Sequence, residues 1–263
     1  MSTLQQSPLG LSNADRDAYW RDGFVIVRGL FGPEEARLLQ VETDRLLAEC
    51  KELIHPRNLR CRFMAHHRTG EQQFEVFDPV NDLSPLCEKI CHDPRMLGVM
   101  ESLYGEPACL FKEKLIFKLP GSNGYPLHQD IPLAWGADFP QTFLTAMLAI
   151  DETSIENGCT ELFRGYHHGF LSTNPAEYML PDDVVDLTRK TDLVMRPGDL
   201  AIFHGLTPHR SGPNRSTKMR RAFYISYNAL SDGGDRRARH YRQFQEQMRK
   251  RLQSQSSEPV FFR

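Results

Sequence analysis

Residues 196–214 have the sequence Arg196-Pro-Gly-Asp-Leu-Ala-Ile-Phe-His204-Gly-Leu-Thr-Pro-His209-Arg-Ser-Gly-Pro-Asn214. The Pro-Gly pair predicts a turn, and the apolar run that follows it predicts a short strand. The glycine and proline after that run predict a loop, which ends in His209. The stretch therefore indicates a small β-scaffold that carries a histidine just beyond the end of a strand.

Similar short runs, rich in β-branched and aromatic residues and separated by turns, occur on both sides of this stretch: 109–118, 142–150, 160–163, 192–196, 199–204 and 219–228. Their spacing predicts an antiparallel β-sandwich or barrel over about 108–230. The part before it, 12–104, is predicted to be mainly helical, and a charged helix is expected at about 235–254. Residues 55–82 are polar and predict a long irregular loop. With no internal repeat or linker, we expect one domain over 1–263.

The composition is that of an ordinary globular protein, with 263 residues, 40% hydrophobic and 25% charged. A formal charge of −2 argues against a nucleic-acid partner held by phosphate contacts. No apolar run approaches the roughly 20 residues that span a membrane, and the first residues lack the layout of a secretory signal. We therefore expect a cytoplasmic protein, without a nucleic-acid or membrane partner. A monomer or weak homo-oligomer is a further expectation. The six scattered cysteines predict reduced thiols, and the Cys87, Cys91 and His92 group is a poor structural zinc site.

A second chemically informative segment is Tyr125-Pro-Leu-His128-Gln-Asp130. Residues i and i+2 of a strand point to the same side, so His128 and Asp130 would present an imidazole and a carboxylate to one point. Two histidines and one carboxylate on a β-scaffold form the facial triad of non-haem iron(II) sites, which leaves coordination positions open. This pattern predicts such a site.

The third ligand could be His204 or His209 by composition alone. His204 lies among apolar residues and has the surroundings of a buried strand histidine with a hydrogen-bond partner. His209 lies beyond the strand, where a metal would be, and we favour it.

Arg220 begins the run Arg220-Arg-Ala-Phe-Tyr-Ile-Ser-Tyr. A strand that places this guanidinium inside a barrel needs a buried anion, because an unpaired buried charge is costly. A dicarboxylate co-substrate that binds iron at its other end would supply the anion. Arg221 would then face outward, although a surface salt bridge for both arginines is the alternative.

With these residues placed, the chain resembles the phytanoyl-CoA dioxygenase family of iron(II)/2-oxoglutarate oxygenases. The resemblance runs from Tyr19 to about Asn228. The motifs that carry it are Pro126-Leu-His-Gln-Asp130, Glu156-Asn-Gly-Cys159, Gly165-Tyr-His-His168, Gly198-Asp199, Phe203-His204 and His209-Arg-Ser-Gly-Pro-Asn214, followed by Arg220. Arg164 departs from the pattern, since many relatives have proline there.

The resemblance implies a mainly β fold with flanking helices and a double-stranded β-helix (jelly-roll, cupin-like) core. It implies Fe(II), 2-oxoglutarate and O2 as cofactor and co-substrates. It assigns iron binding to His128, Asp130 and His209. It also assigns co-substrate binding to Arg220, Ser211, Lys114 and Met147.

The implied reaction is hydroxylation of an aliphatic C–H bond of a small molecule, with release of succinate and CO2. Halogenating relatives usually replace the carboxylate ligand by a small residue, so Asp130 favours hydroxylation. The alternatives are an acyl-CoA hydroxylase of the same family, a jelly-roll protein that binds a metal or small molecule without turnover, and a zinc hydrolase with the same ligands. Candidate substrate-binding residues are Arg62, Phe63, His66, His67, Trp135 and Phe139, and the arginines and histidines among them suggest an anionic or polar substrate.

Overall fold

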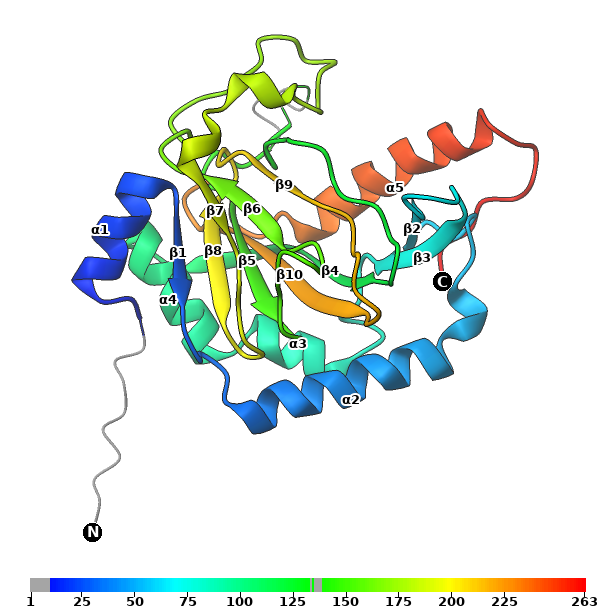
Figure 1. Ribbon diagram of the computed structural model, residues 1–263, viewed down its shortest axis with the longest axis horizontal. Coiled ribbons are helices and arrows are strands. Elements are labelled where there is room, and N and C mark those ends of the chain that lie inside the picture. Colours follow the sequence, from blue (N-terminus) through cyan, green and yellow to red (C-terminus); the bar gives the residue numbers. More distant parts are fainter. Residues whose placement is uncertain (1–9, 133, 135–138) are drawn as a thin grey trace.

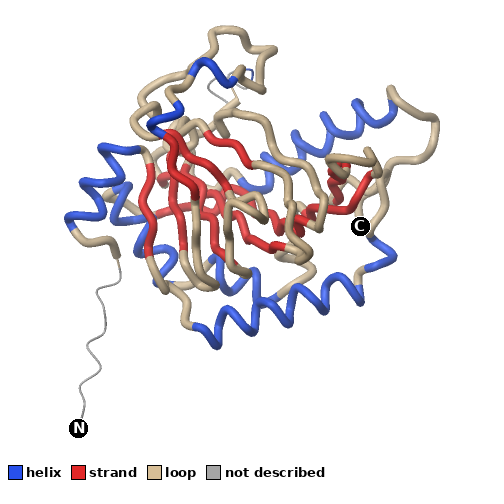
Figure 2. Tube along the Cα trace, in the orientation of Figure 1, coloured by secondary structure: helices blue, strands red, loops and turns tan. Residues whose placement is uncertain are grey.

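A computed structural model of the chain describes residues 10–132, 134 and 139–263 (Figure 1). Helices and strands alternate in its first part, and strands dominate from residue 108 onward (Figure 2). The helices are α1 (Asn13–Asp22), α2 (Pro33–Glu49), α3 (Pro85–Cys91), α4 (Pro94–Tyr104) and α5 (Arg237–Gln253). The strands are β1 (Phe24–Val27), β2 (Cys61–Ala65), β3 (Gln72–Phe77), β4 (Ala108–Lys118), β5 (Leu144–Ala149), β6 (Thr160–Phe163), β7 (Lys190–Asp192), β8 (Leu200–His204), β9 (His209–Ser211) and β10 (Arg220–Ala229).

The strands form two antiparallel sheets. The larger sheet has seven strands in the order β1-β8-β5-β10-β4-β3-β2, and the smaller has three in the order β7-β6-β9. This arrangement, mainly β with flanking helices, confirms the predicted fold class. Because β4, β10 and β5 are neighbours in known register, residues on different strands can be assigned to one face of the large sheet.

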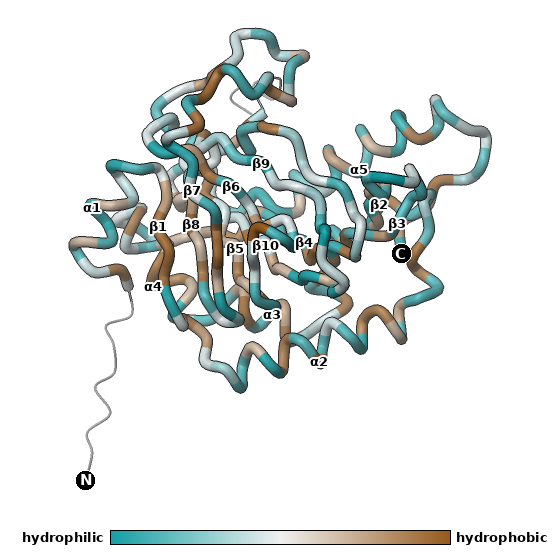
Figure 3. The backbone as a smooth tube through the Cα atoms, viewed as in Figure 1, coloured by the Kyte–Doolittle hydropathy of each residue, from teal (hydrophilic) through white to brown (hydrophobic). Residues whose placement is uncertain are grey.

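The two faces of the large sheet pack against different partners. One face packs against α2, α3 and α4 and forms the main core, which includes Leu39, Ile90, Met100, Leu115 and Phe223. The other face packs against the three-stranded sheet, and this second cluster includes Ile116, Met147, Leu162, Leu193 and Tyr224. In Figure 3, β1 and β5 carry strongly hydrophobic residues, whereas α5 is largely hydrophilic.

Helix α5 packs along β4 through an ion pair whose carboxylate is buried. Arg237 donates to both carboxylate oxygens of Glu113, at 2.6 and 2.9 Å, and Glu113 is fully buried. The segment after α5 returns to the start of β2, where Phe261 forms a parallel bridge with Asn58. The C-terminus consequently lies beside β3 in Figure 1. None of the helices in the described ranges is long and apolar enough to span a membrane.

The structure corrects three details of the expected organisation. The predicted irregular loop 55–82 contains β2 and β3, which extend the large sheet beyond β4. The strand predicted at 192–196 lies earlier, as β7. His209, which was expected at the end of a loop, is the first residue of the short strand β9. At the end of the part predicted to be mainly helical, 12–104, two separate helices follow each other, α3 and α4, and the second begins at Pro94.

Candidate metal centre

The predicted ligands come from two segments that pair through their backbones. His128 lies between β4 and β5, and His209 is the first residue of β9. The amide nitrogen of each histidine donates to the carbonyl oxygen of the other, at 3.0 and 2.9 Å. These two backbone hydrogen bonds hold the two histidine side chains next to each other. Asp130 follows two residues after His128 on the same segment.

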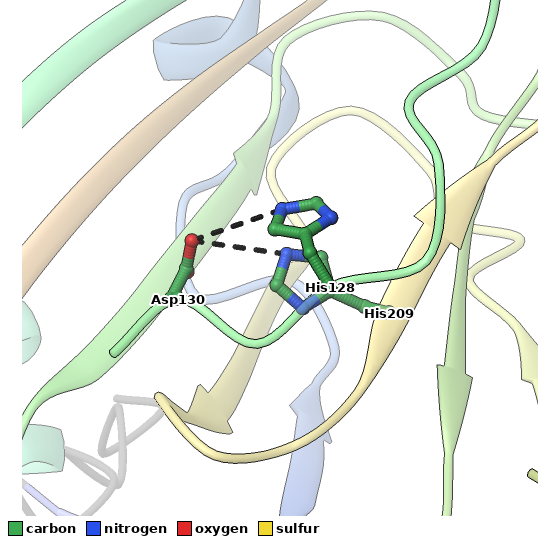
Figure 4. A group of neighbouring side chains, drawn as sticks. All are labelled: His128, Asp130 and His209. Atoms are coloured by element: carbon green, nitrogen blue, oxygen red, sulfur yellow. Dashed lines mark ion pairs between the residues drawn. The ribbon is translucent and has the colours of Figure 1, made fainter. Parts of the chain in front are cut away.

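The three side chains converge on one point (Figure 4). His128 Nε2 and His209 Nε2 lie 4.0 and 3.9 Å from Asp130 Oδ1, and the two imidazole centroids are 4.2 Å apart. One donor atom from each residue lies within 4.8 Å of the others, and all three residues are buried. Within the described residues this is the only group of histidine, cysteine and acidic side chains that meets the geometry of a metal site.

Hydrogen bonds set the tautomer of both imidazoles. His128 Nδ1 lies 2.8 Å from the carbonyl oxygen of Pro126, and His209 Nδ1 lies 3.0 Å from that of Thr207. A carbonyl only accepts, so each Nδ1 must carry the hydrogen, which leaves each Nε2 lone pair free for a metal.

The protonation states also suit a metal. Burial, followed by the charge of His209, lowers the pKa of His128 to about 3, and burial lowers the pKa of His209. Burial would raise the pKa of Asp130, but His209, Lys112 and Lys114 outweigh it and lower that pKa well below its usual range. Two neutral imidazoles and one carboxylate are the donor set of the iron(II) facial triad.

Asp130 is held by a residue that the sequence did not point to. Thr145 in β5 donates from Oγ1 to Asp130 Oδ2 at 2.8 Å, and Oδ1 faces the two histidines. Thr145 Oγ1 also lies 3.3 Å from Ser226 Oγ in β10. The carboxylate is therefore held by β5 of the large sheet.

Arg220 lies farther along the same face of the sheet. It is 2% exposed, and its Nη2 donates to the carbonyl oxygen of Gly158 at 2.9 Å. Its Nε and Nη1 are buried and have no hydrogen-bond partner in the described part of the chain. An unpaired buried guanidinium is costly, so this group fits an anion that the protein itself does not provide.

Lys118 lies directly across from Arg220, in β4, and was not anticipated. It is 0% exposed, and its Nζ donates to Ser211 Oγ at 3.0 Å and to the carbonyl oxygen of Gly212 at 2.6 Å. Burial and then the charge of Arg220 lower the pKa of Lys118, which Glu75 opposes. Ser211 therefore contacts Lys118, and its assignment to the co-substrate stays a prediction.

Lys114 and Met147 lie between the two ends of this face. Both are cross-strand neighbours of Tyr224 in β10. Lys114 Nζ lies 5.3 Å from the centre of the Tyr224 ring, and Thr160 Oγ1 lies 3.6 Å from Met147 Sδ. Along β10, Tyr224 lies between Arg220 and Ser226, the neighbour of Thr145, and a role of Lys114 and Met147 in co-substrate binding stays a prediction.

The candidate substrate residues are not all brought together. Phe63 packs against Phe74 in the main core, on the opposite face of the sheet from the metal centre. His66 stacks on His67 near Gly121 and accepts from the amides that follow it. Phe139 lies in a small apolar cluster with Phe111, Ile131 and Phe143, which adjoins Asp130 in sequence through Ile131. Trp135 lies outside the described residues.

Arg62, unlike Phe63, lies on the face of the metal centre. It pairs with Val76, which pairs with Ile116, and Val76 and Ile116 both belong to the cluster between the two sheets. Phe63 is the next residue of β2, and because successive side chains of a strand point to opposite faces, it packs against the main core instead.

The two residues considered as alternatives are placed as expected. His204 ends β8, and its Nδ1 accepts from the amide of Leu206 at 3.0 Å. It is not part of the three-residue group. Arg221 points to the opposite face from Arg220 and pairs with Asp151 at 2.7 Å and Asp44 at 2.6 Å.

Comparison with known proteins agrees with this geometry. The family model described as "Phytanoyl-CoA dioxygenase (PhyH)" matches residues 19–222. The chain belongs to the phytanoyl-CoA dioxygenase family. It is accordingly a non-haem iron dioxygenase that depends on 2-oxoglutarate, and the predicted family, enzyme class and cofactors are confirmed.

Two relatives and one solved structure illustrate the family. The chain is 33% identical over 229 residues to a 2-aminoethylphosphonate dioxygenase from the uncultured bacterium HF130_AEPn_1, with 84% of each chain covered. It is 36% identical over 140 residues to a methylphosphonate hydroxylase from Gimesia maris, covering 53% of this chain and 52% of the relative. The epimerase SnoN, solved with Fe3+, alpha ketoglutarate and nogalamycin RO, superposes with a TM-score of 0.67 at 22% identity, covering 82% and 83% of the two chains. This likeness supports the jelly-roll fold.

Proposed function

We propose that the chain hydroxylates an aliphatic C–H bond of a small organic anion, with iron(II) bound by His128, Asp130 and His209. The observation that carries the proposal is the convergence of two Nε2 atoms and one carboxylate oxygen in a buried place. When bound, iron(II) with 2-oxoglutarate and O2 supplies the oxidising power, and the co-substrate leaves as succinate and CO2. The carboxylate ligand favours hydroxylation over halogenation.

The chain's own residues orient the iron and the co-substrate. Pro126 and Thr207 hold the imidazole tautomers through their carbonyl oxygens, and Thr145 holds one oxygen of Asp130. We assign the distal carboxylate of 2-oxoglutarate to Arg220, whose Nε and Nη1 have no partner in the described structure. A guanidinium can bind a carboxylate through two parallel hydrogen bonds, which gives both affinity and orientation.

A small polar substrate is supported by two observations. Relatives at 33% and 36% identity act on 2-aminoethylphosphonate and methylphosphonate, which are short organophosphonates. In addition, Lys112 and Lys114 lie in β4 on the face of the large sheet that carries Thr145, the hydrogen-bond partner of Asp130. An acyl-CoA substrate and a binding protein without turnover are the alternatives. A cytoplasmic location and a monomer or weak homo-oligomer also remain our predictions.

The test is a panel of short organophosphonates, carboxylic acids and acyl-CoA thioesters, incubated with iron(II), 2-oxoglutarate and O2. We expect succinate to form and a short organic anion to gain the mass of one oxygen atom. Replacing iron by zinc, or removing O2, should abolish both signals. Turnover without O2 would indicate a hydrolase, and a complete lack of succinate with every compound would indicate a binding protein.

The same assay tests the assignment of Arg220. Arg220→Lys keeps a positive charge but loses the planar pair of donors. We expect the KM for 2-oxoglutarate to rise at least about tenfold, which corresponds to about 1.4 kcal/mol, while the affinity for iron stays unchanged. Arg215→Lys, at an exposed position five residues earlier, serves as the control. An unchanged KM in Arg220→Lys would contradict the assignment.

A further inference from the structure

Besides Lys118 and Arg220, three cationic side chains lie on the face of the large sheet that carries the metal centre: Lys112, Lys114 and Arg62. Lys112, Lys114 and Ile116 follow one another at steps of two in β4, so they point to the same side. Ile116 belongs to the cluster between the two sheets, which fixes that side. Arg62 lies on it as well, because it is aligned with Ile116 through Val76.

None of the three cations lies within 4.0 Å of a carboxylate in the described structure, although other basic residues of the chain form many such pairs. Lys112 Nζ lies 5.3 Å from the centre of the Phe143 ring, and Lys114 Nζ lies 5.3 Å from that of Tyr224. Arg62 stacks on Phe244 of α5 at 4.8 Å. Aromatic faces favour cations but do not neutralise their charge.

Arg62 is held in place while part of its guanidinium stays available. Its Nη1 donates to the carbonyl oxygens of Leu59 and Cys61, at 2.7 and 2.9 Å. Its Nη2 is buried and has no hydrogen-bond partner in the described residues. A buried donor without a partner costs about 1–3 kcal/mol, so a ligand that accepts from it would be favoured.

The cations lie beside the metal ligands, and the pairing of the strands shows roughly how far apart they are. Lys112 is opposite Ser226, Ser226 is opposite Thr145, and Thr145 donates to Asp130. Neighbouring strands lie about 4.8 Å apart, so Lys112 and Thr145 are separated by roughly 10 Å at the backbone. A lysine side chain covers more than half of that span. In agreement, Lys112 and Lys114 both lower the pKa of Asp130.

One carboxylate accompanies the three cations. Asp78 follows Val76 by two residues, is 8% exposed, and has an Oδ1 without a hydrogen-bond partner in the described chain. Burial lowers the pKa of Lys112, and the charges of Lys114 and Arg62 act in the same direction, whereas Asp130 and Asp78 oppose them. If Asp130 is assigned to the metal, three cations and Asp78 leave two positive charges without a counter-ion.

We propose that Lys112 and Arg62, together with Lys114, form a subsite for a doubly charged oxyanion of the substrate, of the phosphonate or phosphate type. The proposal rests on the function proposed above and specifies the chemistry of its substrate. The charge of the subsite matches a dianion better than a carboxylate or a sulfonate. Because Lys112 lies two strands from Thr145, the hydrogen-bond partner of Asp130, the oxyanion binds on the side of the metal centre.

The experiment measures binding separately from turnover. Mixing the protein with iron(II) and 2-oxoglutarate without O2 should give the visible charge-transfer band of the iron–keto acid complex, which changes when a substrate binds nearby. We titrate this complex with ethylphosphonate, with ethanesulfonate, which has the same shape and one negative charge fewer, and with ethyl phosphate. Wild type should bind ethylphosphonate at least tenfold more tightly than ethanesulfonate. Ethyl phosphate distinguishes a phosphate ester from a phosphonate as the preferred source of the dianion.

The decisive variant is Lys112→Met, which keeps most of the side-chain volume. It should weaken ethylphosphonate binding at least tenfold without changing the band formed with 2-oxoglutarate, and Lys112→Arg should restore part of the affinity. Lys89→Met, at an exposed position of α3, should behave as wild type. If Lys112→Met does not fold, Lys112→Gln takes its place.

Two results would overturn the subsite: equal affinities for the phosphonate and the sulfonate, or unchanged phosphonate affinity in a folded Lys112 variant. The absence of any band with iron and 2-oxoglutarate would instead contradict the proposed function itself. The two failures are therefore distinguishable.

Discussion

Thr145 Oγ1 donates to Asp130 Oδ2 at 2.8 Å, so the two oxygens of this carboxylate have separate tasks. Oδ2 is fixed to β5, and Oδ1 faces the two imidazoles at 4.0 and 3.9 Å. The strand thereby holds the proposed ligand in one orientation before a metal binds.

Replacing this hydroxyl should weaken metal binding without unfolding the protein. Thr145→Val keeps the shape but leaves Asp130 Oδ2 without its donor. Losing such an outer partner typically costs 10- to 100-fold in metal affinity, so we expect about that loss for iron(II) or cobalt(II) measured by equilibrium titration. Thr191→Val in β7 is the matched control. Equal affinity in both variants would contradict the role of Thr145.

The two candidate histidines can be separated by their variants. His209→Ala should lose bound iron and all succinate formation, because the triad would have only two ligands. His204→Ala should keep iron and mainly lower the melting temperature, since its Nδ1 serves the amide of Leu206. Metal content and thermal unfolding check both statements. Loss of iron in His204→Ala alone would mean that the ligand assignment is wrong.

His204 should make the stability of the metal-free protein depend on pH. Burial, then His167 and His168, lower its pKa from 6.5 to about 4. Between these values the unfolded chain binds more protons than the folded one, so the free energy of unfolding should fall as the pH drops from 6.5 to 4. In His204→Asn, whose side-chain oxygen can accept the same hydrogen bond, this fall should be smaller. Urea unfolding at several pH values provides the measurement. If the free energy of unfolding falls equally with pH in wild type and in His204→Asn, the prediction is wrong.

Lys118 should make co-substrate binding depend on pH. Burial and Arg220 lower its pKa below the ordinary 10.5, so it loses its proton earlier than a surface lysine. Because the protonated form attracts a carboxylate, the affinity for 2-oxoglutarate should fall as the pH rises toward 10. Lys118→Met should bind 2-oxoglutarate several-fold more weakly at pH 7 and show a flatter profile. Calorimetric titration with 2-oxoglutarate at several pH values measures both. If the affinity depends on pH in the same way in wild type and in Lys118→Met, Lys118 does not cause the dependence.

The sequence predicts much of the β-core because its strands follow local patterns. His128 and Asp130 are recognisable from their spacing of two, and β8 from its apolar run. β2 and β3 were missed because Arg62, Gln72 and Gln73 interrupt the apolar pattern of the two strands. β9 has three residues and is defined mainly by its pairing with β6, which no local pattern reveals.

The residues missing from the predicted site are those that depend on register. Lys118 belongs beside Arg220 only because β4 and β10 align in one way, and Thr145 reaches Asp130 from a different segment. Phe63 was grouped with Arg62 by proximity in sequence, but successive side chains of a strand point to opposite faces, so Phe63 packs against the main core while Arg62 lies on the face of the metal centre. The relationships of Lys118 with Arg220 and of Thr145 with Asp130 join segments that are distant in sequence, so no local pattern reveals them.

Strand β4 carries one residue of each proposed anion site on the same face, with Lys112 near its middle and Lys118 at its last position. Six residues of extended chain separate the two by roughly 20 Å at the backbone. The proposed substrate subsite and the residues assigned to 2-oxoglutarate therefore use different parts of one strand. Substitutions at position 112 can then alter which compounds are oxidised while the requirement for 2-oxoglutarate stays the same, so substrate preference can diverge within this fold at a single residue.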